Sequence, residues 1–412
     1  MGFIYNIGIS LTGLALTCIA PFNSKIKKGV IGRKQTFSTL RKQLNNNDKT
    51  LWFHCASLGE YEQGLPVFKM LRQHYSTHKI ILSFFSPSGF EIRKNSPIAD
   101  IVIYLPLDTR TNAKHFLDLA NPELTVFVKY DIWPNILNEL KRRRLRAILI
   151  SASFRKNQSY FKFYGKHLRS ALFAFEHIFT QNKLSKTLLE TIHYDRATVS
   201  GDTRFDRVYS QLNIDNTLDF IKTFKQEKLC FIAGSTWPED ESILIDFINT
   251  KASNDIKFII APHNIKSGQI QNIKNNLKVE TVLFSEKSEK SLQQAQVFII
   301  DTIGILSKIY SYGDISYVGG ALGSTGLHNT LEPAVFGIPI IIGNHYEKFP
   351  EAKEMIAIGG MFSISTQKEF NNILHSLIQN PKKRIQAGKT NFNYVQENKG
   401  AVNLILKYLE PV

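Results

Sequence analysis

The chain has 412 residues, 43% hydrophobic and 21% charged, which is enough for two ordinary domains that each bury a core. These proportions, with no low-complexity tract or short-period repeat, exclude a disordered or fibrous protein. A net charge of +16 favours a polyanionic partner, which could be nucleic acid, anionic lipid or a phosphorylated substrate. Three scattered cysteines are typical of a reducing compartment.

An uncharged, mostly apolar segment occupies residues 3–21, and basic residues cluster directly after it, in residues 25–42. About 20 apolar residues can cross a bilayer, and basic residues behind them favour a cytoplasmic location for that side. A cleaved signal peptide would carry its positive charge before the apolar stretch. The pattern favours an uncleaved membrane anchor, 1–24, followed by a basic linker, 25–49. Polar residues within the segment keep open a helix that lies in the membrane plane.

From about residue 50, short β-rich runs alternate with helical patterns. The runs are continuously apolar, as parallel strands covered on both faces should be. The first series comprises residues 51–57, 79–86, 100–108, 124–131, 146–153, 177–181 and 197–203. The second series comprises residues 228–235, 257–263, 281–285, 297–302, 315–320 and 338–343.

Two such series predict two doubly wound, Rossmann-like α/β domains with a cleft between them. The expected domains are 50–210 and 228–390, with a linker at 211–227 and a C-terminal helix at 391–412. Ligands of such sheets bind beyond the carboxyl ends of the strands, so the residues directly after each run are the candidates for a site.

The turn Gly234-Ser235-Thr236 follows the first run of the second series. Thr236 and Glu239 fit a capping box, which is the structural interpretation. The free N–H groups of the same helix start could instead receive a phosphate. The spacing leaves both interpretations open.

The segment GGALGSTGLHNTLEP, residues 319–333, is more specific. Gly319 and Gly320 end a strand, and glycine permits close approach of a ligand to the backbone. Asn329 and Glu332 also fit a capping box. A cap explains neither His328, which precedes Asn329, nor the density of glycines. A carboxylate there could accept hydrogen bonds from ribose hydroxyls while N–H groups face phosphate. The segment therefore predicts a nucleotide-sugar pocket.

In the first domain, Glu60 stands where the first strand turns into its helix. It could act as a general base or only stabilise the helix dipole. Further candidates at the ends of runs are Ser86, Ser88, Gly89, Asp131, Arg155, Arg204, His263, Ile303, Gly304 and His328. The sequence contains no CxxC, HExxH or DxD pattern for a metal, and no GxGxxG or P-loop.

Taken in order, these motifs resemble the Kdo transferase family, whose members move 3-deoxy-D-manno-octulosonic acid (Kdo) from CMP-Kdo to lipid A precursor. The resemblance covers nearly the whole chain. It rests on an N-terminal anchor, SLGE ending at Glu60, WPN at 133–135, GDTRFD at 201–206, GST at 234–236, DTIG at 301–304 and the block at 319–333. It implies a GT-B architecture, inversion at the anomeric carbon, and no metal or cofactor.

The resemblance also implies roles for single residues. Glu60 would be the general base, and Arg204, in place of the usual lysine, would lie near the donor phosphate. The backbone around Ile303 and Gly304 would meet the cytosine. The CMP phosphate and ribose would be bound by Ser235, Thr236, Asn329 and Glu332.

Two departures from the family pattern limit the assignment of these roles to this chain. Where the family has Glu-Thr-Glu before its Trp-Pro-Asn, this chain has Lys129-Tyr130-Asp131, which puts a second catalytic carboxylate in doubt. Where an arginine and a histidine are usual, Pro262-His263-Asn264 offers only a histidine. Donor affinity would then vary with pH near the titration of His263.

The expected partners are CMP-Kdo, lipid A precursor and the lipids of the inner membrane, at its cytoplasmic face. A nucleotide-sugar 2-epimerase-like isomerase is the alternative, since it shares twin α/β domains and a glycine-rich nucleotide block. It would need no anchor and no lipid acceptor. A nucleic-acid-binding module could explain the charge, but the chain has no recognition-helix or aromatic-platform motif.

Overall fold

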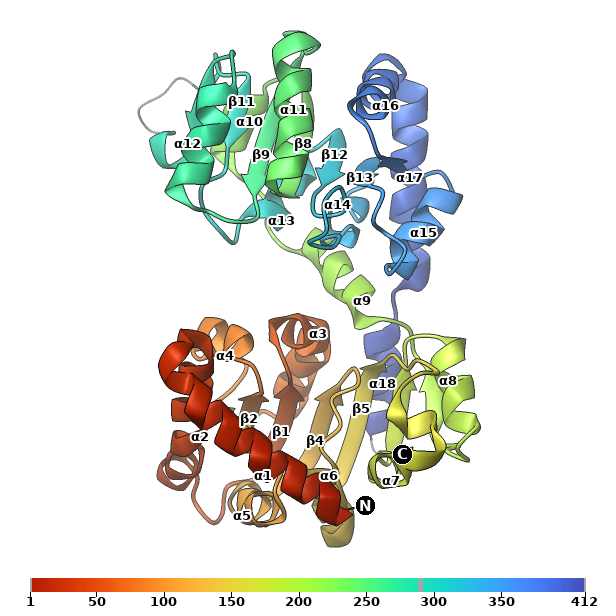
Figure 1. The fold of residues 1–412 in the computed structure, drawn as a ribbon. Coiled ribbons are helices and arrows are strands. Elements are labelled where there is room, and N and C mark those ends of the chain that lie inside the picture. Colours follow the sequence, from red (N-terminus) through yellow and green to blue (C-terminus); the bar gives the residue numbers. More distant parts are fainter. Residues whose placement is uncertain (1, 288–291, 411–412) are drawn as a thin grey trace. The chain divides into compact units, whose positions relative to one another are not determined.

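The computed structural model describes residues 2–287 and 292–410, and the chain divides into two compact units (Figure 1). Unit 1 comprises Met1–Arg207 and Lys399–Val412, and unit 2 comprises Val208–Asn398. Each contains one seven-stranded parallel sheet with helices on both faces. The prediction of two doubly wound α/β domains of GT-B type is confirmed.

The sheet of unit 1 has the order β3-β2-β1-β4-β5-β6-β7, so the strand order reverses between β1 and β4. Its strands are β1 Thr50–Cys55, β2 Lys79–Phe84, β3 Ile101–Tyr104, β4 Pro122–Val128, β5 Arg146–Ala152, β6 His177–Thr180 and β7 Ala197–Val199. All residues of β1 are buried, because apolar side chains pack on both of its faces. The carboxyl ends of β1 and β4 form the switch point at which such sheets bind ligands.

The sheet of unit 2 has the order β10-β11-β9-β8-β12-β13-β14, with its switch point between β8 and β12. Its strands are β8 Leu229–Thr236, β9 Ile256–Pro262, β10 Thr281–Leu283, β11 Val297–Ile299, β12 Ile315–Val318, β13 Ile340–Gly343 and β14 Met361–Ile364. The sequence predicted the first six. It missed β14, an edge strand with a partly exposed middle that lacks a continuous apolar run.

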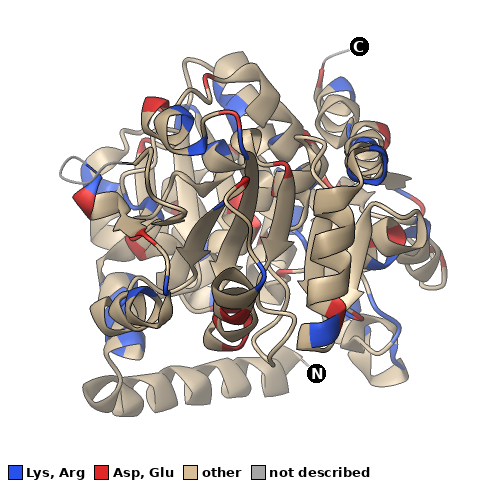
Figure 2. Ribbon diagram, turned by 90° about the horizontal axis from the view of Figure 1, so that it is seen from above, with Lys and Arg blue, Asp and Glu red and all other residues tan. Residues whose placement is uncertain are grey.

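Helices cover both faces of each sheet (Figures 1 and 2). Those of unit 1 are α1 Gly2–Ile19, α2 Ser24–Gln43, α3 Leu58–His74, α4 Pro87–Arg93, α5 Arg110–Ala120, α6 Pro134–Arg143, α7 Lys166–Leu172, α8 Lys183–Glu190 and α18 Ala401–Leu409. α9, Thr203–Ser210, runs across the boundary between the units. Those of unit 2 are α10 Asp219–Lys225, α11 Pro238–Thr250, α12 Ser267–Asn276, α13 Leu306–Ile309, α14 Leu331–Ala334, α15 Pro350–Ala357, α16 Gln367–Gln379 and α17 Pro381–Asn398.

The connecting segments are more ordered than the sequence predicted. The expected linker at 25–49 is mostly α2, because Thr36 and Leu40 are buried against unit 1. The expected linker at 211–227 contains α10, whose Ile221 and Phe224 lie in the core of unit 2.

The C-terminal helix expected at 391–412 is two helices, α17 in unit 2 and α18 in unit 1. Gly400, with φ +118°, separates them. The carboxylate of Asp206 accepts hydrogen bonds from the backbone N–H groups of Gly400 (2.9 Å) and Ala401 (3.2 Å). α18 then buries Ile405 and Leu409 in the core of unit 1.

Candidate functional site

Glu60 lies at the switch point of unit 1, in the first turn of α3 directly after β1. Its Oε2 accepts a hydrogen bond from the backbone N–H of Ser57 at 3.1 Å, so it does cap the helix. Only 7% of the residue is exposed. Burial, and then the negative charge of Asp131, raise the pKa of Glu60 to about 6. The capping role and the chemistry of a general base are therefore compatible in the same carboxyl group.

Asp131 follows β4, the strand next to β1, and is held by two ring N–H donors. Its Oδ2 lies 2.6 Å from Nε2 of His54 and accepts a hydrogen bond from Nε1 of Trp133 at 3.0 Å. Behind it, Nδ1 of His54 is 2.8 Å from Oγ of Ser83, which accepts from Nε1 of Trp52 at 2.8 Å. His54, Ser83 and Trp52 are fully buried. Asp131 thus ends a chain of hydrogen bonds that reaches into the core.

The sequence did not single out His54. It stands within an apolar run, where a lone histidine resembles a satisfied core residue, and its partner Asp131 is 77 residues away. A polar residue inside a buried strand was the available signal, because buried polar groups need hydrogen-bond partners.

The Trp-Pro-Asn segment starts α6, and a residue from another loop caps that helix. The Asp108 carboxylate accepts from the backbone N–H groups of Asn135 and Ile136, both at 2.9 Å. It also accepts from the hydroxyl of Tyr5 in α1 at 2.8 Å, while the side chain of Asn135 donates to that of Asn6 at 3.0 Å. The segment therefore joins the carboxyl edge of the sheet to the N-terminal helix.

The serines predicted as cleft candidates lie at the start of α4. Ser86 caps this helix by accepting from the backbone N–H of Ser88 at 3.3 Å, and both side chains are partly exposed. Gly89 is buried, and a β-carbon there would lie 2.3 Å from the ring of Phe84. Arg155 is exposed after β5.

Arg204 lies in unit 1, in the first turn of α9. Its Nε donates to the carboxylate of Asp202 at 2.8 Å, and that carboxylate also accepts from the side chain of Gln63 at 2.8 Å. The guanidinium of Arg204 is therefore held by an ion pair with Asp202 in the segment that follows β7.

In unit 2, the candidates follow four neighbouring strands, β11, β9, β8 and β12. Ile303, which is 82% exposed, and Gly304, with φ +92°, lie after β11. His263 lies after β9, the Gly-Ser-Thr turn ends β8, and residues 319–333 follow β12. Because parallel strands end at one edge, the sheet gathers these segments on one side. The loop after β13 joins them through a hydrogen bond from the backbone of His345 to Ala321, and the sequence did not predict this loop as part of the site.

The expected capping box of Thr236 and Glu239 is shifted by one residue. α11 begins after Trp237, whose backbone N–H donates to the carboxylate of Asp240 at 2.9 Å. Thr236 is fully buried, and its hydroxyl donates to a carboxylate one turn later in α11. Ser235, with φ +55°, is partly exposed and remains available to a ligand.

Asp240 ties the two glycine-rich segments together. Besides Trp237, its carboxylate accepts from the hydroxyl of Tyr317 at 2.6 Å and the backbone N–H of Gly320 at 3.0 Å. A β-carbon on Gly319 would lie 2.4 Å from the carbonyl oxygen of Ser235. Gly319 is thus required by the close approach of two backbone segments. The first turn of α11 also carries Glu239 and Glu241, so its helix dipole already faces three acids.

His263, Trp237 and His328 form an aromatic cluster beside these turns. The rings of Trp237 and His263 stack with centroids 4.8 Å apart, and those of the two histidines are 4.4 Å apart. Nε1 of Trp237 donates to Nε2 of His328 at 3.1 Å. Burial and then the nearby His263 lower the pKa of His328 to about 4, and burial lowers that of His263. His328 is therefore neutral at neutral pH and offers no positive charge to a phosphate.

Asn329 and Glu332 contact each other through Nδ2 and Oε1 at 3.2 Å. Asn329 also accepts from the backbone N–H of Leu331 at 3.2 Å, but the helix cap is Thr330, one residue later than predicted. α14 is a single turn, Leu331–Ala334.

Among the residues that the structure describes, no three His, Cys, Asp or Glu side chains form a group that could hold a metal ion. Transfer without a metal or cofactor stays a prediction.

A family model described as 3-deoxy-D-manno-octulosonic-acid transferase (Kdo transferase) matches residues 32–207. The transferase of Haemophilus influenzae is 28% identical over 380 residues, which cover 88% of this chain and 86% of that protein. The transferase of Aquifex aeolicus is 27% identical over 343 residues, which cover 82% of this chain and 88% of that protein. Both are 3-deoxy-D-manno-octulosonic acid transferases.

Among solved structures, the UDP-GlcNAc 2-epimerase of Neisseria meningitidis bound to UDP-GlcNAc has a TM-score of 0.62 at 15% identity, covering 88% of this chain and 99% of that one. A putative UDP-N-acetylglucosamine 2-epimerase of Listeria monocytogenes has a TM-score of 0.57 at 12% identity, covering 87% and 95%. At these identities the two epimerases show only that the fold is shared. The two sequence relatives are both Kdo transferases. The chain belongs to the Kdo transferase family and is a glycosyltransferase.

Proposed function

We propose that the protein transfers Kdo from CMP-Kdo to lipid A precursor in lipopolysaccharide synthesis, with Glu60 as the general base. The buried position of Glu60 at the switch point of unit 1 carries this proposal. A carboxyl group with a pKa of about 6 is largely ionised at neutral pH and is a stronger base than an ordinary glutamate.

In the proposed reaction, Glu60 takes the proton of an acceptor hydroxyl while that oxygen attacks the anomeric carbon of Kdo. The new carbon–oxygen bond forms as the bond to the phosphate of CMP breaks, and the electron pair leaves with CMP. Attack from the opposite side inverts the anomeric centre. The proton on Glu60 then passes to solvent, which restores the carboxylate.

We assign donor binding to the carboxyl edge of unit 2 and acceptor binding to that of unit 1. Ser235, Asn329 and Glu332 are the proposed contacts of the CMP phosphate and ribose. The three acids of α11 and the low pKa of His328 make this edge poor in positive charge. Arg204 is therefore the proposed cation for the leaving phosphate, because guanidinium binds phosphate oxygens in pairs.

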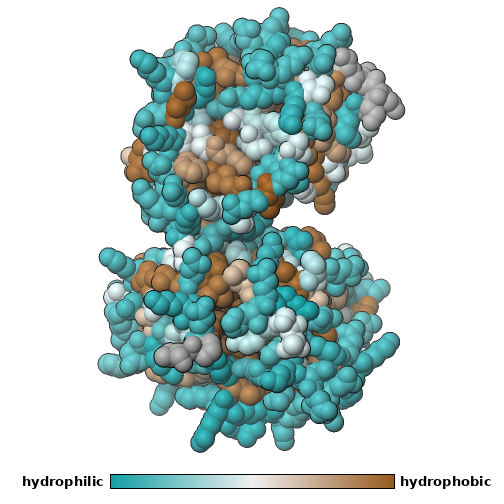
Figure 3. Space-filling view, turned by 180° about the vertical axis from the view of Figure 1, so that it is seen from behind, coloured by the Kyte–Doolittle hydropathy of each residue, from teal (hydrophilic) through white to brown (hydrophobic). Residues whose placement is uncertain are grey.

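The N-terminal helix supports a membrane location. An 18-residue window within Gly2–Phe22 has a mean hydropathy of 1.7, and only 6% of that window is buried. Figure 2 shows α1 free of charged residues, and Figure 3 shows that the opposite face of unit 1 is mainly hydrophilic. α1 packs along unit 1 through Tyr5 and Asn6. These contacts favour the in-plane alternative over a helix that leaves the protein to cross the bilayer.

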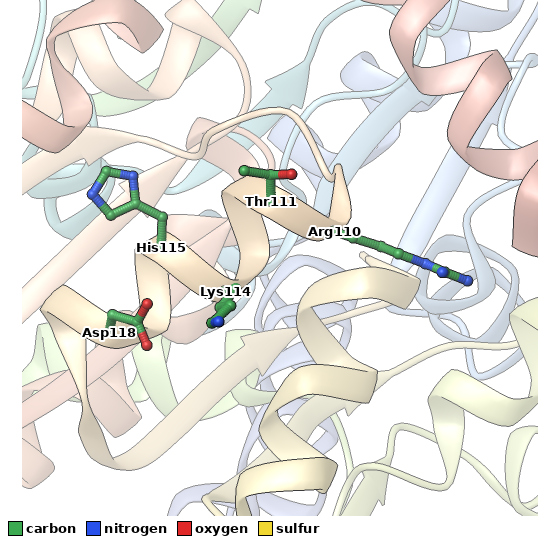
Figure 4. Close-up of a pocket in the computed structure, with 5 residues that line it drawn as sticks. All are labelled: Arg110, Thr111, Lys114, His115 and Asp118. Carbon is green, nitrogen blue, oxygen red and sulfur yellow. The ribbon is translucent and has the colours of Figure 1, made fainter.

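Basic side chains accompany this helix. α5 carries an open surface hollow of about 530 Å³ lined by Arg110, Thr111, Lys114, His115 and Asp118 (Figure 4). Nε2 of His115 lies 2.8 Å from the guanidinium of Arg41 in α2. We propose that these cations face anionic lipid headgroups at the cytoplasmic side of the inner membrane.

The test is to incubate membranes that contain the wild type or Glu60→Gln with CMP-Kdo and tetra-acylated lipid A precursor, and to measure the masses of the lipid products. We expect the wild type to add Kdo, and Glu60→Gln to bind CMP-Kdo normally but to lose at least about a hundredfold in turnover. Ordinary activity of Glu60→Gln would refute the assignment of the base. Conversion of a nucleotide sugar without any lipid would favour the epimerase-like alternative.

A further inference from the structure

His54 is fully buried, yet its imidazole lies one hydrogen bond behind the acidic edge of unit 1. The carboxyl ends of β1 and β4 are adjacent, with His54 paired to Phe127 in the register, so Glu60 and Asp131 follow neighbouring strands. The proposed mechanism uses Glu60 and leaves Asp131 and His54 without a role.

The contact with Asp131 requires a hydrogen on Nε2 of His54. Nε2 lies 2.6 Å from a carboxylate oxygen of Asp131, so it carries a hydrogen. Oγ of Ser83 accepts from Nε1 of Trp52 and also lies 2.8 Å from Nδ1 of His54. The hydroxyl of Ser83 donates to the carbonyl of Phe53 at 3.5 Å. Hydrogen bonds therefore link Trp52 through Ser83 and His54 to Asp131, and His54 is the donor to the carboxylate.

The negative charge of Asp131 raises the pKa of Glu60 by more than His54 lowers it. Trp133 adds a second N–H donor to the same oxygen and packs against Phe85, with ring centroids 4.8 Å apart, which fixes the carboxylate from the other side. The side chain of Asp131 is only 16% exposed, so its charge is poorly screened by water.

We propose that His54 is a positioning residue for the transfer reaction, which holds the Asp131 carboxylate fixed beside Glu60 so that its charge strengthens Glu60 as a base. This inference rests on the proposed role of Glu60. Other titratable groups also act on this site. His54 and Lys129 lower the pKa of Glu60, and Cys55 also interacts with it. The groups that interact electrostatically with Asp131 are Tyr5, Cys55, Glu60, Asp108 and Tyr160.

Two substitutions separate the contacts of His54. An asparagine can replace Nδ1 and keep the contact with Ser83, but it is too short to reach Asp131. A glutamine can place an N–H near the position of Nε2 and keep the contact with Asp131. His54→Asn should therefore release Asp131, and His54→Gln should retain it.

The same sheet provides a matched control at its opposite edge. His78 is also buried and lies 2.7 Å from a carboxylate oxygen of Glu123, but these residues stand at the amino ends of β2 and β4. His78→Asn removes an equivalent pair that is remote from Glu60. It reports what the loss of a buried histidine–carboxylate contact does to folding alone.

The measurement is the pH profile of kcat, with CMP-Kdo saturating, for wild type, both His54 variants and His78→Asn. For His54→Asn we expect kcat to fall by about threefold to tenfold and the acid limb to move to lower pH, by less than in Asp131→Asn, because the loss of His54 also removes a smaller effect of opposite sign on Glu60. KM for CMP-Kdo should be unchanged. His54→Gln should restore the wild-type limb, and His78→Asn should leave it unmoved.

An unmoved limb in His54→Asn, or equal impairment of His54→Asn and His54→Gln, would overturn the proposal. Should His54→Asn not fold, Asp131→Asn at the partly exposed position tests the same charge and should move the limb in the same direction. Glu60→Gln tests the proposed base independently of His54. If it is inactive while His54→Asn is normal, only the role of His54 is wrong, whereas an active Glu60→Gln removes the proposed base itself.

Discussion

Replacing Glu60 by glutamine should make the folded protein more stable at neutral pH, although the variant lacks the proposed base. Burial and Asp131 raise the pKa of Glu60 from 4.5 to about 6, so the folded protein holds this proton more tightly than the unfolded chain does. The stability that proton binding provides is complete below about pH 4.5 and is lost as the pH rises through about 6.

The size of the effect follows from that difference of about 1.5 pH units. At about 1.4 kcal/mol per unit, an ionised Glu60 costs the fold about 2 kcal/mol above pH 6.5. Glutamine keeps the acceptor for the N–H of Ser57 but carries no charge. For a unit of about 200 residues, a gain of about 2 kcal/mol corresponds to a rise in Tm of roughly 4–8 °C.

The assay is thermal unfolding of wild type and Glu60→Gln between pH 4 and 8. The difference in Tm should be small at pH 4, grow between pH 4.5 and 6.5, and then stay constant. A difference that does not depend on pH would refute the reasoning. Glu123→Gln provides a control of opposite sign, because the hydrogen bond from His78 lowers the pKa of Glu123. Its loss should destabilise the fold at neutral pH and have less effect as the pH falls.

Three further predictions concern unit 2 and the anchor. Asp240→Ala should lower Tm and weaken CMP binding at least about tenfold, because the loss of its three hydrogen bonds frees both glycine-rich turns. As a control, Glu239→Ala at an exposed position should change stability by less than about 0.5 kcal/mol. The KM for CMP-Kdo should be constant from pH 7 to 8.5 and depend on pH only in the acid range, since burial lowers the pKa of His263; a change centred near neutral pH would contradict this. The exposed positions Leu11→Asp and Leu14→Asp together should release the protein from sedimented membranes without loss of activity on detergent-dispersed acceptor, and unchanged sedimentation would exclude α1 as the anchor.

The sequence predicted those parts of the fold that depend on local pattern. Continuous apolar runs identified the strands of both sheets except β14, whose middle is partly exposed at a sheet edge. The helix caps were each misplaced by one residue, at Trp237 and Thr330, because backbone geometry and not residue type alone selects a cap. The sequence could not predict that Asp108 caps α6, because Asp108 lies in a different strand connection.

The residues of the candidate site likewise fall into those that local motifs predicted and those that depend on distant partners. Motif order brought out Glu60 and the two glycine-rich segments, which topology then placed at the two switch points. His54 and Asp240 were missed because their importance lies in partners that the fold supplies from far along the chain, such as Asp131 and Tyr317. No spacing rule connects such pairs before the sheet order is known.

The division of the C-terminus between the units has a consequence for synthesis on the ribosome. Unit 1 contains the first half of the chain, but its core is closed by α18, and Asp206 caps that helix only once residues 400 and 401 exist. Unit 2 is an uninterrupted stretch that ends at Asn398. The second unit in the sequence is therefore the first whose residues are all available, and a nascent chain exposes an incomplete unit 1 until α18 has been synthesised.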